Sequence, residues 1–95
     1  MREMQQPNRE TTMTTMEIQA ATVNGKPGAR LVVRGADDAM RVICDKLDIV
    51  PVVDIANVRE RLFSAQAELV AVRNQLLPYV VGKPVDGRVE LRSQK

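Results

Sequence analysis

Apolar residues recur with a seven-residue period over residues 54–78, and this is the most regular pattern in the chain. The positions are separated alternately by three and four residues: Ile55, Val58, Leu62, Ala65, Leu69, Val72 and Leu76. Such spacing places side chains on one side of an α-helix, as at the a and d positions of a coiled coil. The pattern predicts one long amphipathic helix over residues 54–77, with Asp54 as N-cap and Pro78 just beyond its end.

The length of this predicted helix favours self-association through the seven apolar residues. A helix of this length extends roughly 35 Å, which is more than a chain of this size needs for its own core. Leucines at the a positions combined with β-branched residues at d favour assemblies larger than a parallel dimer. Two alternatives stay open, in which the helix packs only on its own chain or binds a helix of a foreign protein. We expect a homo-oligomer.

Residues 16–35 predict a β-hairpin. Runs with β-branched residues lie on both sides of residues 24–28, a cluster of turn-forming residues. In the second run Leu31 and Val33 alternate with Arg30, Val32 and Arg34, so one face of this strand is apolar and the other is partly charged. Because proline has no N–H for a strand ladder, we expect Pro27 to lie in the loop.

A short helix is predicted over residues 36–47, followed by an extended connection or short edge strand at residues 49–53. The helix has one apolar face with positions spaced by three and four: Ala36, Met40, Ile43 and Leu47. Aspartates in its first turn favour the positive end of the helix dipole. After Pro78, residues 79–95 predict a basic extended segment with a turn at Asp86–Gly87.

The chain is therefore expected to be α+β, with one small domain over residues 16–95. Residues 1–15 are polar and lack a period of either helix or strand, so they predict a flexible arm. A chain of 95 residues is near the lower end of what folds without help, which also favours assembly.

Composition argues against an enzyme. The chain has no histidine, which removes the commonest general base and the commonest metal ligand. We therefore predict no catalytic residue, no metal site, no cofactor and no small-molecule substrate. The single cysteine suits a reducing compartment, and no apolar stretch is long enough to span a membrane. These features predict a cytoplasmic protein. The short chain, its polar arm, its few aromatic residues and its lack of histidine suggest a bacterial host.

Two similar basic blocks supply the candidate contact residues. Each reads Gly-Lys-Pro followed by two arginines four residues apart: Lys26, Arg30 and Arg34 in one block, and Lys83, Arg88 and Arg92 in the other. One interpretation makes them basic fingers that contact a partner or grip phosphates. The plainer interpretation is that they are ordinary turn residues and solvated strand faces.

The sequence favours a non-catalytic, oligomeric binding protein that acts by stoichiometric contact with another macromolecule. A protein partner is favoured over nucleic acid, because the blocks lack the interleaved aromatic residues typical of single-strand binders. A small inhibitor or adaptor from a bacterium or bacteriophage fits this description. A nucleic-acid-binding regulator that uses the Gly-Lys-Pro blocks and a structural assembly subunit are the alternatives.

Overall fold

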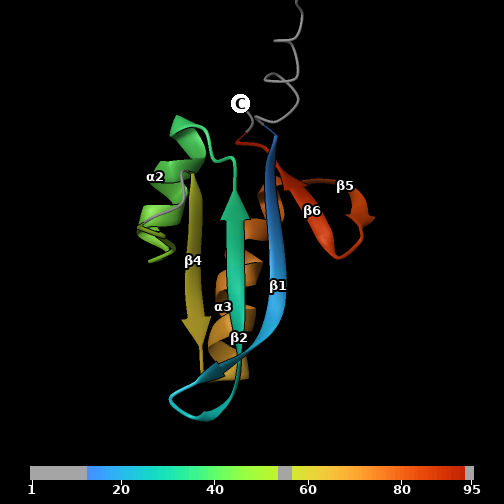
Figure 1. The fold of residues 1–95 in the computed structure, drawn as a ribbon. Helices are drawn as coiled ribbons and strands as arrows, with labels where there is room; N and C mark the ends of the chain where they lie inside the picture. The colour runs from blue at the N-terminus through green and yellow to red at the C-terminus, as the bar shows by residue number, and fades with distance from the viewer. Residues whose placement is uncertain (1–12, 54–56, 94–95) are drawn as a thin grey trace, which may run out of the picture.

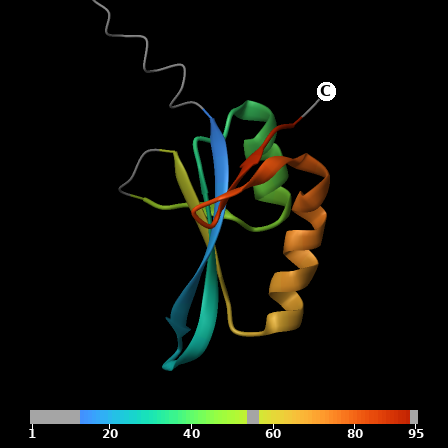
Figure 2. The ribbon, with the colours of Figure 1, turned by 90° about the vertical axis from the view of Figure 1, so that its right-hand side faces the viewer.

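The structure, a computed structural model, describes residues 13–53 and 57–93 and has an antiparallel sheet with helices on one side (Figures 1 and 2). Its elements in chain order are β1 (Thr14–Val23), β2 (Lys26–Arg34), α2 (Asp38–Lys46), β3 (Val50–Pro51), β4 (Val58–Phe63), α3 (Gln66–Leu76), the 3-10 turn η2 (Leu77–Tyr79), β5 (Val80–Val85) and β6 (Arg88–Leu91). The six strands lie in the order β3-β4-β2-β1-β6-β5.

The β1–β2 hairpin occupies the centre of the sheet, in the region where the sequence predicts a hairpin. Its loop is only Asn24–Gly25, with φ of 52° and 79°, and Val23 lies opposite Lys26. Positive φ at both loop positions is typical of the type I′ turn that joins tightly paired strands. Pro27 lies within β2 opposite Thr22, so its predicted place in the loop is wrong. Because Val23 and Lys26 close the hairpin as a hydrogen-bonded pair, the next pair needs no N–H from Pro27.

The core lies between the sheet and the two helices. Alternate residues of the strands face the helices, and each helix contributes one buried side: Met16, Leu31, Val33, Phe63 and Leu91 from the strands, and Met40, Cys44, Leu69, Val72 and Leu76 from the helices. Asp37 caps α2 by accepting a 2.9 Å hydrogen bond from the backbone N–H of Met40. The described residues therefore form two layers, in which the helices cover one face of the sheet and leave the other open (Figure 2).

The long helix predicted over residues 54–77 is wrong, and so is the predicted coiled coil. The described part of this segment contains a strand, β4, and a separate helix, α3. β4 lies within the sheet, where it pairs with β2 over Val58–Phe63 and with the two residues of β3. The observed fold is dominated by a six-stranded sheet, with α3 limited to Gln66–Leu76.

Two arginines explain why residues 58–63 form a strand. Arg59 and Arg61 lie on the helix-facing side of β4, opposite Val33 and Leu31 of β2. Arg59 donates to the carbonyl of Ile49 (3.1 Å) and Arg61 to the carbonyl of Leu47 (2.9 Å), near the end of α2. The side chains that face the core from a strand are usually apolar. Here these hydrogen bonds supply the two arginines with partners, so charged residues occupy such positions.

The seven apolar residues through which the sequence predicts self-association lie in different environments. Leu69, Val72 and Leu76 are buried in the core of their own chain. Val58 and Leu62 lie on the other face of β4, Ala65 is the exposed N-cap of α3, and Ile55 lies outside the described residues. Leu69, Val72 and Leu76 thus pack within their own chain. Formation of a homo-oligomer stays a prediction, but the long helix that was its basis is wrong.

The remaining predicted segments also shift in their bounds. The predicted arm overlaps the first two residues of β1, Thr14 and Thr15, whereas residues 1–12 and the predicted N-cap Asp54 lie outside the described residues. The basic C-terminal segment contains β5 and β6, which are joined at Asp86–Gly87. No helix in residues 13–53 and 57–93 combines the length and the apolar character needed to cross a membrane.

Two leucines of the seven-residue pattern, Leu62 and Leu76, test this fold directly. Leu76 is fully buried, whereas the side chain of Leu62 is 45% exposed. We expect Leu76→Ala to lower the free energy of unfolding by about 2–5 kcal/mol, because it leaves a cavity in the core. Leu62→Ala, which removes the same atoms, should lower it by less than about 1 kcal/mol. Urea unfolding of both variants measures the difference, and equal losses would contradict the described fold.

Candidate functional site

The uncovered face of the sheet carries most of the contact residues that the sequence predicts. We call it the open face. The strand register arranges its side chains in three rows that run across the sheet: Leu62, Arg30 and Gln19 in the first; Val50, Glu60, Val32, Glu17, Arg88 and Val85 in the second; Val58, Arg34, Thr15, Glu90 and Val81 in the third. Apolar and charged side chains therefore alternate over a surface made by strands that are distant in sequence.

Val32 is the centre of this arrangement. It is only 4% exposed, although it lies on the face that the helices do not cover. Glu17 of β1 and Glu60 of β4 lie beside it across the sheet, and Arg30 and Arg34 lie two residues away along β2. Long charged side chains cover neighbouring apolar surface with their aliphatic stems. An apolar centre with a ring of alternating charge results.

Three arginines of the open face form ion pairs with glutamates of the same chain. Arg30 Nε lies 3.4 Å from Glu60 Oε1, and Arg88 Nε lies 3.4 Å from Glu17 Oε1. Arg92 follows β6, and its Nε lies 2.8 Å from Glu90 Oε2. Within the described residues, Arg30 Nε is covered from solvent and donates no hydrogen bond. The positive charge of the face is thus largely balanced.

The two Gly-Lys-Pro blocks are not equivalent in the structure. In the first block the turn precedes Lys26, and Arg30 and Arg34 follow on β2. In the second block Lys83 lies inside β5, where the register with β6 shifts between Val81 and Val85. The structure therefore brings the arginines of both blocks to the open face, but the two lysines belong to different strands at different places in the sheet.

Sequence reasoning missed the glutamates and Val32. The alternation in β2 places Val32 between two arginines, which was a usable signal for an apolar residue on a charged face. The helix that the sequence predicts over residues 54–77 includes Glu60, and the pairing of β1 with β6 joins residues about seventy positions apart. No local pattern shows such a pairing.

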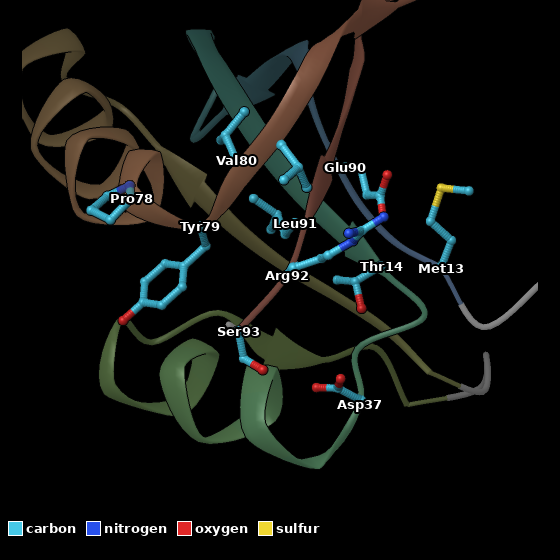
Figure 3. Close-up of a pocket in the computed structure, with 11 residues that line it drawn as sticks. Met13, Thr14, Asp37, Pro78, Tyr79, Val80, Glu90, Leu91, Arg92 and Ser93 are labelled. Carbon is cyan, nitrogen blue, oxygen red and sulfur yellow. The ribbon is translucent and has the colours of Figure 1, made fainter. Parts of the chain in front are cut away.

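A pocket of about 530 Å³ lies beside the ends of β1, β6 and α2 (Figure 3). Three of the polar side chains that line it already have partners within the fold. Arg92 binds Glu90 (2.8 Å), Thr14 Oγ1 donates to the carbonyl of Gly35 (2.8 Å), and Asp37 caps α2. These contacts stabilise the chain around the pocket, so they do not identify it as a ligand site.

Cys44 lies in the core, where its thiol is less acidic than an exposed one. Its side chain is fully buried, and burial raises the pKa of the thiol above its ordinary value. Arg59 nearby lowers this pKa and Asp45 raises it, both by less than burial does. In residues 13–53 and 57–93 no group of three cysteine or acidic side chains is placed to hold a metal ion.

Comparison of the chain with protein-family models, with curated proteins and with solved structures finds no match.

The two faces of the sheet should respond differently when arginines are removed. Arg59 is 11% exposed, and its Nη1 lies 2.7 Å from Asp45 Oδ1. Arg59→Met should lower the free energy of unfolding by about 1–3 kcal/mol, because it leaves the Ile49 carbonyl without its donor. Arg88→Met on the open face should change it by about 1 kcal/mol or less, as for exposed ion pairs. Urea denaturation compares them, and a larger loss for Arg88→Met would show that the open face holds the fold together.

Reactivity of the thiol tests the burial of Cys44. At pH 8 the native protein should react with Ellman's reagent far more slowly than the unfolded protein in urea, because a buried thiol with a raised pKa forms little thiolate. The rate is followed by absorbance, and equal rates in the two states would contradict the described core.

Proposed function

We propose that this protein is a non-catalytic binding protein of the cytoplasm that acts by stoichiometric contact with another protein. The proposed contact surface is the open face of the sheet. The observation that carries the proposal is Val32 with its ring of Arg30, Arg34, Glu17 and Glu60, on a face that the two helices leave uncovered. A small inhibitor or adaptor, from a bacterium or bacteriophage, needs no more than such a surface.

The composition of the open face supports a protein partner. Interfaces between proteins combine an apolar centre with a polar rim and are enriched in arginine. Beyond Val32 and its charged ring, the open face has partly exposed apolar residues toward both of its sides, among them Leu62 on β4 and Val85 on β5. A partner with apolar side chains and charges of both signs would match this surface.

Two features weigh against nucleic acid as the main partner. Three of the four arginines are paired with glutamates, so they do not form the dense basic surface that binds phosphates. Of the two aromatic residues, Phe63 faces the helices, and Tyr79 lies in the turn after α3. The open face thus offers no aromatic side chain on which bases stack.

The experiment starts by capturing partners from an extract of the source organism and identifying them by mass spectrometry. Binding of the purified partner is then measured for wild type, Arg88→Glu, Leu62→Glu and a matched control. Arg73→Glu, on the exposed side of α3, makes the same charge reversal on the opposite side of the domain. We expect the open-face substitutions to weaken binding at least about tenfold, and the control to change it less than about threefold.

A reversed result would contradict the proposal. Loss of binding in Arg73→Glu with full binding in Arg88→Glu and Leu62→Glu would move the contact surface to the helices. A gel shift with random DNA and RNA at low salt tests the alternative. Binding that falls steeply with ionic strength and is lost in Arg30→Ala, Arg34→Ala would identify a nucleic-acid-binding regulator instead.

A further inference from the structure

The β1–β2 hairpin extends beyond both strands that flank it. β6 pairs with β1 only over Thr14–Glu17, and β4 pairs with β2 only from Ala29 onward. The hairpin continues past them to its turn and projects away from α3 (Figures 1 and 2). In the part of the chain that the structure describes, residues 18–23 of β1 therefore have a neighbouring strand on one side only.

The register identifies the backbone groups along this outer edge. Since Val23 and Lys26 close a two-residue loop, their N–H and C=O groups point toward each other. Backbone direction alternates along a strand, so Ile18, Ala20 and Thr22 direct their N–H and C=O groups away from β2. The same alternation directs the N–H and C=O groups of Met16 toward Val89 of β6, in agreement with the observed pairing.

The other edges of the sheet carry features that oppose the addition of a strand. The outer side of β2 near the turn has Pro27, which lacks an N–H. β3 is only Val50–Pro51, and β5 combines a register shift with Lys83 and Pro84. Short strands, prolines, bulges and lysines are the usual means by which proteins protect sheet edges.

The edge of β1 has none of these features. Its sequence over residues 18–23 is Ile-Gln-Ala-Ala-Thr-Val, with no charge, no proline and no glycine. Ile18 is 37% exposed and lines an apolar pocket of about 350 Å³ together with Leu77 and Val89. An uncharged strand with an unpaired edge next to apolar surface is a template for pairing with another strand.

We propose that this edge pairs with the same edge of a second copy of the chain, antiparallel and about a two-fold axis beside Ala21. In this register Ala20 lies opposite Thr22 of the other copy, and Ala21 lies opposite its own equivalent. The pairing forms roughly four backbone hydrogen bonds between the copies. It extends only as far as Gln19, so it leaves room for β6, whose last pair with β1 is Arg88 with Glu17.

Self-pairing is favoured by the chemistry of the segment. A two-fold axis brings identical residues together, so a charged edge would repel its own copy, whereas residues 18–23 are neutral. The small side chains of Ala20 and Ala21 lie at the axis, where the strands approach most closely. The pairing does not rest on the proposed function, because the charged residues around Val32 lie nearer the centre of the sheet and the second copy does not cover them.

Sedimentation velocity over a range of concentrations tests the proposal with a pair of charge variants. Ala21→Lys and Ala21→Glu each place like charges opposite each other across the axis, so each should raise the dimer dissociation constant at least about tenfold. An equal mixture of the two variants should form a heterodimer about as readily as wild type dimerises. Ala71→Lys, on an exposed position of α3, makes the same chemical change away from the edge and should dimerise as wild type does. Circular dichroism checks that each variant is folded.

A second variant tests the edge hydrogen bonds themselves. Ala20→Pro removes an outward N–H that β2 does not use, so the hairpin should keep its structure while dimers are lost. A wild type that stays monomeric at the highest concentration would overturn the proposal. So would a dimer that persists in both Ala21 variants, or a mixture of these variants that stays monomeric.

Discussion

The register of the β1–β2 hairpin is the constraint on which the rest of the structure depends. The two-residue turn at Asn24–Gly25 fixes which residue of β1 lies opposite which residue of β2. That register places Leu31 and Val33 toward the helices and Val32 on the opposite face. Since side chains alternate along a strand, a slip by one residue would exchange the two faces and bring arginines into the core.

The strands that flank the hairpin extend both of its faces. β4 brings Phe63 to the core and Glu60 to the open face, and β6 does the same with Leu91 and Arg88. The open face is therefore a product of the same pairing that builds the core. Its ion pairs join strands across the sheet, and their partial exposure makes them small contributors to stability. The fold therefore depends little on these charged residues, which belong to the contact surface that we propose.

The sequence allows prediction of the elements whose signals are local. The central hairpin follows from its turn residues, and α2 follows from an apolar face that includes Met40 and Ile43. The segment from residue 54 onward misleads for a physical reason. Val58 and Leu62 are four residues apart, a spacing that places them on one side of a helix and also on one face of a strand.

Tertiary contacts decide between these two interpretations in favour of the strand. The core-facing positions of β4 include Arg59, whose partners are a carbonyl and a carboxylate close to α2. This inverts the usual pattern of an apolar core face, so the sequence of β4 alone does not indicate a strand. The candidate site, too, can be predicted only in part. Its arginines form a local sequence pattern, whereas its glutamates come from β1, β4 and β6 and are brought beside them by long-range strand pairing.

Proton NMR of the native protein tests the central claim, that β4 lies beside β2 and places Glu60 next to Val32. Because this is a non-hydrogen-bonded antiparallel pair, the α-protons of Val32 and Glu60 are close together. A nuclear Overhauser effect between these two α-protons is predicted, together with one between Arg30 and Leu62. Contacts from α-protons to amide protons three residues later across residues 58–63 would show a helix and contradict the account.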